Sequence, residues 1–192
     1  MALEPVAALR RAHHEFSTRL GEVRDDLWVR QSACEDWSVG DLVDHVIGGN
    51  VFTVAVIRGA GAEEAMASAI KGAESGVDDR VDAYESSAAE MLALFGSPGA
   101  LGGVYHHVVG DVPGTVVVAL RTNDITLHAW DLARSGGFDE QLDPGLVRHV
   151  WDKMSPNVDE LAAGDRFGSG SRGDLPDDAP LQARLLDITG RR

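Results

Sequence analysis

Residues 121–137, RTNDITLHAWDLARSGG, are the most informative stretch of the sequence. Arg121, Asp124, His128 and Asp131 fall within roughly 80° of the circumference if each residue of an α-helix turns by about 100°. Most of the remaining surface of this helix is apolar, through Val117, Val118, Leu120, Ile125, Leu127, Trp130 and Leu132. The stretch therefore predicts a long helix with one narrow polar stripe.

The spacing of two residues on this stripe points to metal chemistry. Asp124 and His128 are one turn apart, so a carboxylate oxygen and an imidazole nitrogen could converge on one ion. His45 is the best candidate for a third ligand, since it shares a predicted helix face with Leu42 and Val46 and should point inward. Two imidazoles and one carboxylate suit Zn²⁺ with an open fourth position, while Fe²⁺, Ni²⁺ or Co²⁺ are also compatible with these ligand types.

A simpler interpretation stays open for each half of this pattern. Asp124 and His128 could be a favourable i,i+4 pair on an amphipathic helix whose polar stripe faces water. A lone inward histidine such as His45 is more often a hydrogen-bonded core residue than a ligand. It is less common for an inward histidine on one helix and an Asp/His pair on another to occur together by chance than for either to occur alone. Their combination favours the metal site.

Other signals place further helices around this one. Ser38-Val39-Gly40-Asp41 has the form of a capping box, which predicts a helix from Ser38 to about Arg58. Further helices are predicted at about residues 5–29, 78–95, 115–135, 144–163 and 180–188, with a short or weak helix over 63–70 and a loop over 167–179. Residues 102–113 could form a small extended excursion or hairpin. Helices separated by loops favour an all-α bundle with its site between facing helices.

Composition limits the partners and the compartment. A chain of 192 residues fits a single domain over 1–192. Its 17 Lys and Arg oppose 31 Asp and Glu, a net charge of −14 without a dense basic cluster. Neither nucleic acid nor an anionic membrane surface is therefore an expected partner. One cysteine, Cys34, cannot form an internal disulfide, and we see no signal peptide or long apolar run, so a cytoplasmic protein is expected.

Several polar residues are weaker candidates. Asp131, one turn beyond His128, could orient the ligand imidazole, and Arg121 could meet an anionic substrate or balance Asp124, although a surface salt bridge is the simpler reading. For Cys34 we favour a packed or merely reducible thiol over a catalytic one. Asp44 is adjacent to His45 in the sequence, but we expect it to be solvated. His106 and His107 could be reserve metal ligands or proton shuttles, but we favour surface or packing roles for both.

Three segments resemble the DinB-like, mycothiol-dependent maleylpyruvate isomerase superfamily, particularly its actinobacterial metal-binding branch. They are CEDWSVGDLVDHVIGGN (34–50), RTNDITLHAWDLARSGG (121–137) and DDAPLQARLLDITGR (177–191). The resemblance implies a DinB-like four-helix bundle with short extra helices, in which His45, Asp124 and His128 hold the metal. The isomerase has Glu where Asp124 stands here, and its further C-terminal domain is not evident in this chain.

The resemblance also implies an activity. A divalent metal would activate the thiolate of a low-molecular-weight, mycothiol-like thiol for an S-transferase or isomerase reaction with an electrophilic small molecule. A homodimer would be compatible with it. Two alternatives stay open: a non-catalytic metal-binding or small-molecule-binding stress protein, and a structural bundle in which any metal is incidental.

Overall fold

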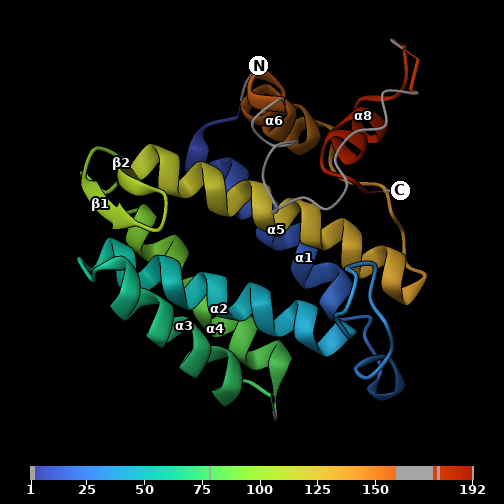
Figure 1. Ribbon diagram of the computed structural model, residues 1–192, viewed down its shortest axis with the longest axis horizontal. Coiled ribbons are helices and arrows are strands. Elements are labelled where there is room, and N and C mark those ends of the chain that lie inside the picture. The colour runs from blue at the N-terminus through green and yellow to red at the C-terminus, as the bar shows by residue number, and fades with distance from the viewer. Residues whose placement is uncertain (1–2, 78, 159–174, 177, 192) are drawn as a thin grey trace. The chain divides into compact units, whose positions relative to one another are not determined.

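The computed structural model describes residues 3–77, 79–158, 175–176 and 178–191. These residues are mostly helical with one small two-stranded hairpin, which confirms the predicted all-α class (Figure 1). The chain divides into two compact units, Glu4–Gln141 and a smaller unit that joins Met1–Leu3 to Leu142–Arg192. That the whole chain behaves as a single domain stays a prediction.

The larger unit is a bundle of four helices with one extra helix. Its main helices are α1 (Pro5–Leu20), α2 (Val39–Ile57), α4 (Arg80–Phe95) and α5 (Gly114–Gly136), and the extra helix is α3 (Ala62–Ser75). Within this unit, α2 packs against α3, α4 and α5, while α1 packs against α4 and α5 (Figure 1). The contact between α2 and α5 is the one that matters for the site, because it joins the two predicted ligand-bearing helices.

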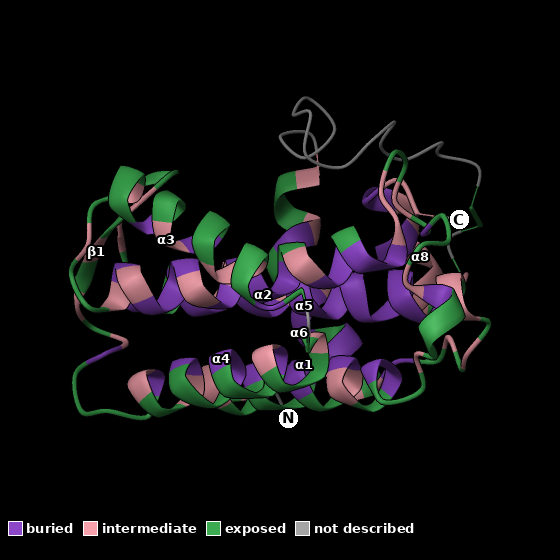
Figure 2. Cartoon of the chain, turned by 90° about the horizontal axis from the view of Figure 1, so that it is seen from below, coloured by how far each residue is buried: buried purple, intermediate pink, exposed green. Residues whose placement is uncertain are grey.

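The helices turn their apolar faces inward, and their outer faces are exposed (Figure 2). Fully buried side chains come from all four main helices and include Leu9, Phe16, Leu42, Ile47, Tyr84, Met91, Ile125, Leu127 and Leu132. Burial of this apolar surface is the main source of stability for such a bundle. It also fixes which face of α2 meets α5.

The start of α2 has the predicted capping box. The Ser38 hydroxyl accepts a hydrogen bond from the Asp41 backbone N–H at 3.1 Å, and the Ser38 N–H donates to Asp41 Oδ2 at 2.8 Å. The Ser38 hydroxyl also donates to Asp41 Oδ2 at 2.6 Å, and this bond, with the one from the Ser38 N–H, lowers the pKa of Asp41. Because the cap fixes the first turn, it also fixes the direction in which His45 leaves the helix two turns later.

Among the described residues, α2 is the one helix whose length and composition would let it cross a membrane. More than half of its apolar stretch is buried inside the structure. Because core helices meet the same criterion, this match is weak evidence for a membrane span.

Three helix boundaries differ from the predictions. The first helix stops at Leu20, because the chain turns at Gly21 and continues as a short 3₁₀ helix, η1 (Asp25–Leu27). The weak helix predicted over 63–70 is the longer α3, whose Ala65 and Ala69 are buried in a cluster with Phe52 and Val56. In the smaller unit, α6 (Pro144–Met154) passes into η2 (Ser155–Asn157), and residues 159–163 of the helix predicted to 163 lie outside the described residues.

The smaller unit also contains the predicted C-terminal helix as α8 (Leu181–Ile188), which packs against α6. The Arg184 guanidinium lies over the Trp151 ring at 4.6 Å from its centroid, and the Leu142 N–H donates to Gln182 Oε1 at 3.0 Å. Most of the loop predicted over 167–179 lies outside the described residues.

The excursion predicted over 102–113 is a hairpin of β1 (Val104–His107) and β2 (Gly110–Pro113), paired antiparallel. His106 Nδ1 lies 2.6 Å from Asp111 Oδ1 on the opposite strand, and the His107 ring meets the Phe52 ring edge-on at 5.1 Å. His106 therefore contacts the opposite strand of the hairpin, and His107 contacts α2. Neither histidine belongs to the metal-ligand groups that the described residues form. This agrees with the surface and packing roles that we favoured.

Candidate metal centre

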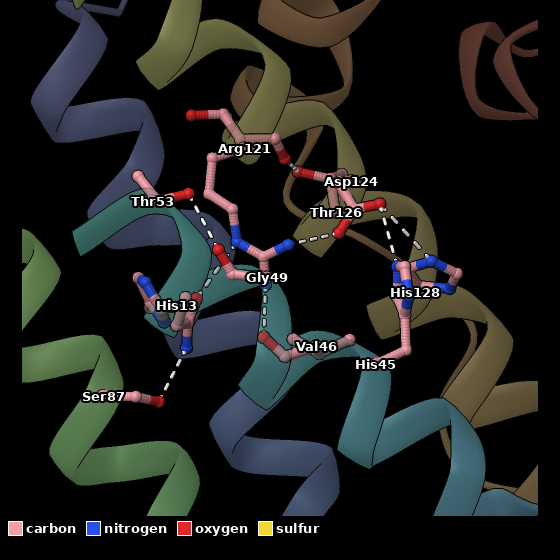
Figure 3. A network of polar contacts seen from close by, with 12 residues as sticks. His13, His45, Val46, Gly49, Thr53, Ser87, Arg121, Asp124, Thr126 and His128 are labelled. Atoms are coloured by element: carbon pink, nitrogen blue, oxygen red, sulfur yellow. Dashed lines mark hydrogen bonds and ion pairs between the residues drawn. The ribbon is translucent and has the colours of Figure 1, made fainter. Parts of the chain in front are cut away.

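The packing of α2 on α5 brings the three predicted ligands together (Figure 3). His45 Nε2 lies 3.4 Å from Asp124 Oδ1, and His128 Nε2 lies 3.5 Å from the same oxygen. The two imidazole rings meet edge-on, with 4.9 Å between centroids and 71° between planes. One carboxylate oxygen therefore faces two imidazole nitrogens.

These separations fit a bound metal ion. Two donor atoms that hold one zinc ion at about 2.0–2.1 Å and a tetrahedral angle lie roughly 3.3 Å apart. The observed 3.4 and 3.5 Å are close to that value. The side chains of His45 and Asp124 are 40% and 33% exposed, whereas that of His128 is 9% exposed. The group is therefore buried at His128 and partly exposed at His45 and Asp124.

Electrostatics prepare Asp124 to bind a cation. Burial alone would raise the pKa of Asp124, but the charges of His128 and Arg121 outweigh burial and hold it well below its usual range. Conversely, burial would lower the pKa of His128, but Asp124 and the hydrogen bonds around the ring raise it well above its usual range. A metal ion binds imidazole and carboxylate in their deprotonated forms, and the raised pKa of His128 opposes deprotonation, so we expect the affinity for metal to fall as the pH falls.

Asp131 lies behind His128 and contacts its other nitrogen. Asp131 Oδ2 is 2.9 Å from His128 Nδ1, and the residue is only 1% exposed. A carboxylate at this position keeps Nδ1 as the donor and turns Nε2 toward Asp124. The position agrees with the orienting role predicted for Asp131, and that role stays a prediction about function.

Cys34 approaches the same side of His128. Its Sγ lies 3.5 Å from Asp131 Oδ2 and 3.9 Å from His128 Nδ1, so these three residues are a second group that could hold a metal ion. The 2.9 Å between His128 Nδ1 and Asp131 Oδ2 is a hydrogen-bond distance and is shorter than the roughly 3.3 Å expected for two donors on one zinc ion. We therefore assign this second group a supporting hydrogen-bonded role.

The loop before α2 places Cys34 and an aromatic ring at the site. The Ala33 N–H donates to Ser135 Oγ at 2.8 Å, which attaches the loop to α5. The Trp37 ring lies 4.8 Å from the His45 ring and 6.0 Å from the His128 ring, centroid to centroid. The position of Cys34, directly before the helix that bears His45, had allowed for its approach to the site. The ring contacts of Trp37 were not predicted, and their only signal was that Trp37 directly precedes the capped helix.

Arg121 is buried, so its reading as a surface salt bridge is wrong. Its side chain is 6% exposed, and its Nη1 donates to Asp124 Oδ2 at 2.5 Å. Nε donates to Asn50 Oδ1 at 3.0 Å and Nη2 to the Val46 carbonyl at 2.6 Å. Burial lowers the pKa of Arg121, and Asp124 opposes that shift. Of the two functional roles considered, the geometry favours balancing Asp124 over meeting an anionic substrate.

Asp44 also differs from its predicted solvated state. It accepts two hydrogen bonds of 2.8 Å from the Arg80 guanidinium, and its side chain is only 19% exposed. This pair joins α2 to α4. The sequence could not reveal it, because the pairing depends on how α4 is rotated against α2.

Asp131→Asn tests the orienting role. The amide removes the carboxylate charge behind His128, and loss of such a partner typically weakens metal binding about 10–100-fold. Competition for Zn²⁺ with a chromogenic chelator measures the change. Asp26→Asn is the control, because Asp26 is an exposed carboxylate paired with Arg24. An Asp131→Asn affinity equal to that of Asp26→Asn would contradict the role.

The fold and the site together define a class of protein, a four-helix bundle with a His/Asp/His group between two of its helices. A family model described as the mycothiol maleylpyruvate isomerase N-terminal domain matches residues 9–133, and the chain belongs to this family. The matched range contains all three predicted ligands.

The chain is also similar to two mycobacterial sequences and to two solved structures. Two sequences from Mycobacterium tuberculosis, both named as uncharacterized proteins, are 36% identical over 145 residues, which cover 76% of this chain and 74% of theirs. The crystal structure of the mycothiol-dependent maleylpyruvate isomerase and that of a mutant of it each superpose with a TM-score of 0.65 and 16% identity. Each match covers 84% of this chain and 72% of the other, and at this identity it shows the fold alone.

Proposed function

We propose that the protein is a metal-dependent enzyme that uses a low-molecular-weight, mycothiol-like thiol as cosubstrate in an S-transferase or isomerase reaction. The observation that carries the proposal is the His45, Asp124 and His128 group, with donor spacings that suit a metal and with one exposed side. Family membership supports the thiol, because the family takes its name from a mycothiol-dependent isomerase. When bound, a divalent ion, for which the donors favour Zn²⁺, would stabilise a thiolate near neutral pH.

Some residues of the site would bind the ion, and others would position the residues that bind it. His45, Asp124 and His128 would hold it, while Asp131 fixes the ring of His128 and Arg121 fixes Asp124. The exposed edges of His45 and Asp124 leave a side from which the thiol and an electrophile could approach. In S-transfer, a sulfur–carbon bond forms, the leaving group departs with its electron pair, and the thiol proton passes to solvent.

Metal content is the first test. Protein purified without a polyhistidine tag should contain one tightly held divalent ion per chain, and a His45→Ala/His128→Ala double variant should lose it. The matched control is His106→Ala/His107→Ala, which removes two hairpin histidines and should keep the ion. Absence of metal in the wild type, even after supplementation with Zn²⁺, Co²⁺, Ni²⁺ or Fe²⁺, would contradict the proposed centre.

Turnover is the second test. The metal-loaded protein should consume mycothiol in the presence of a chromogenic electrophile, and the His45→Ala/His128→Ala variant should not. If the wild type binds metal but consumes no thiol across a panel of thiols and electrophiles, the non-catalytic binding protein becomes the better description.

A further inference from the structure

We infer that Arg121, Asn50 and Gly49 together make Asp124 a ligand through one oxygen only, and so bias the centre toward four-coordinate ions such as Zn²⁺ and Co²⁺. This inference rests on the proposed metal centre. Arg121 acts in it as a positioning residue, because it reaches the centre only through Asp124.

The two oxygens of Asp124 have different neighbours (Figure 3). Oδ1 faces the Nε2 atoms of His45 and His128 at 3.4 and 3.5 Å. Oδ2 instead accepts a hydrogen bond of 2.5 Å from Arg121 Nη1. A charge-assisted hydrogen bond to a buried guanidinium is strong, so Oδ2 stays turned away from the imidazoles.

The Arg121 guanidinium has a fixed position, because it also donates to two acceptors other than Asp124. Its Nε donates to Asn50 Oδ1 and its Nη2 to the Val46 carbonyl. Asn50 is itself fully buried and donates from Nδ2 to Ser87 Oγ at 3.1 Å, and this hydroxyl donates to the Tyr84 carbonyl at 2.9 Å. The guanidinium is therefore attached to α2, and through Asn50 to α4, as well as to its own helix.

Gly49 supplies the space that this arrangement needs. A Cβ atom at this position would lie 2.2 Å from Arg121 Nη1 and 2.7 Å from its Cζ. Glycine inside a helix is less favourable than alanine, so a glycine in the middle of α2 needs a reason. The close approach of a buried guanidinium is such a reason, and it explains why α2 has no side chain where it crosses Arg121.

One consequence is a restricted donor set. A carboxylate with both oxygens free can bind a metal through both of them and raise its coordination number, as it does for Ca²⁺. With Oδ2 held by Arg121, the centre offers two imidazole nitrogens and one oxygen. Such a set suits tetrahedral Zn²⁺ or Co²⁺ with one open position, whereas Mn²⁺ prefers oxygen-rich octahedral surroundings.

Cobalt spectroscopy tests the inference, because tetrahedral Co²⁺ absorbs visible light much more strongly than Co²⁺ of higher coordination. The wild type should show strong tetrahedral bands and should bind Co²⁺ in clear preference to Mn²⁺. Arg121→Met and Gly49→Ala, the second of which moves the guanidinium without removing a charge, should each weaken the bands several-fold and narrow that preference. Gly61→Ala is the control, because a Cβ at Gly61 would meet no atom within 4 Å.

The outcomes separate this inference from the proposed centre. If the wild type binds no Co²⁺, the metal centre itself is wrong. If the wild type binds Co²⁺ with the weak bands of six-coordination, or if folded Arg121→Met or Gly49→Ala keeps wild-type bands and metal preference, only the inference about Arg121 is wrong. Circular dichroism establishes first which variants are folded, and a six-coordinate wild-type spectrum overturns the inference even if neither variant folds.

Discussion

Asp124→Asn lowers the free energy of unfolding of the metal-free protein by about 3 kcal/mol, because it leaves the charge of Arg121 buried without a carboxylate. The other two acceptors of Arg121, the Asn50 amide and the Val46 carbonyl, are neutral. Removal of one partner from a buried ion pair typically costs about 3–5 kcal/mol. We expect the lower end of this range, because the Asp124 side chain is 33% exposed and water can partly replace it.

Urea unfolding in the presence of a chelator, followed by both circular dichroism and fluorescence, measures this loss. The double variant Arg121→Met/Asp124→Asn should be more stable than Asp124→Asn alone, because the unpaired charge is then gone. Asp111→Asn is the control: Asp111 pairs with His106 on the exposed hairpin, and its loss should cost no more than about 1 kcal/mol. An Asp124→Asn variant as stable as Asp111→Asn would contradict the assignment of Arg121 as a buried charge that depends on Asp124.

The convergence of His45, Asp124 and His128 could be predicted from the sequence, because the face on which each residue lies is set by its own helix. The period of an α-helix determines which residues share a face, and the capping box at Ser38 sets where that period begins in α2. Once both helices turn an apolar face inward, polar residues on those faces meet. This prediction did not depend on the structure of the loops.

The surroundings of these residues depend on tertiary structure and could not be predicted in the same way. Arg121 is buried because α2 passes closely at Gly49, and the sequence of α5 contains no sign of that approach. Cys34 and Trp37 reach the site through the loop before α2, in which Asp36 adopts a φ of 64° and the Ala33 N–H is bound to Ser135 Oγ of α5. His13 and Tyr84 meet across 71 residues of chain, so no local pattern joins them.

His13 makes the larger unit sensitive to acid. It is buried in α1, where its Nδ1 lies 2.7 Å from the Tyr84 hydroxyl and its Nε2 has no hydrogen-bond partner within the described part of the chain. Burial, with smaller contributions from the charges of Arg121 and Arg10, lowers the pKa of His13 from 6.5 to about 3. The folded protein therefore keeps this imidazole neutral at a pH where the unfolded chain protonates it.

The sign of the effect follows from proton binding. Because the folded-state pKa is the lower one, the contribution of His13 to stability is complete above pH 6.5 and is lost as the pH falls toward about 3. Within that window the loss is about 1.4 kcal/mol per pH unit. The raised pKa of His128 acts in the opposite sense, since its contribution is present below 6.5 and is lost only as the pH rises through its folded value.

His13→Asn should remove most of this acid sensitivity. Asparagine keeps a polar atom near the position of Nδ1 for Tyr84 but cannot take up a proton, so the stability lost between about pH 6.5 and about pH 4.5 should shrink by roughly 2–3 kcal/mol. Urea unfolding of the metal-free variant at the two pH values measures the difference. His14→Asn is the control, because His14 is the exposed neighbour on the same helix. If both variants lose stability with acid as the wild type does, His13 is not the group that titrates, and the acid sensitivity belongs to another group of the fold.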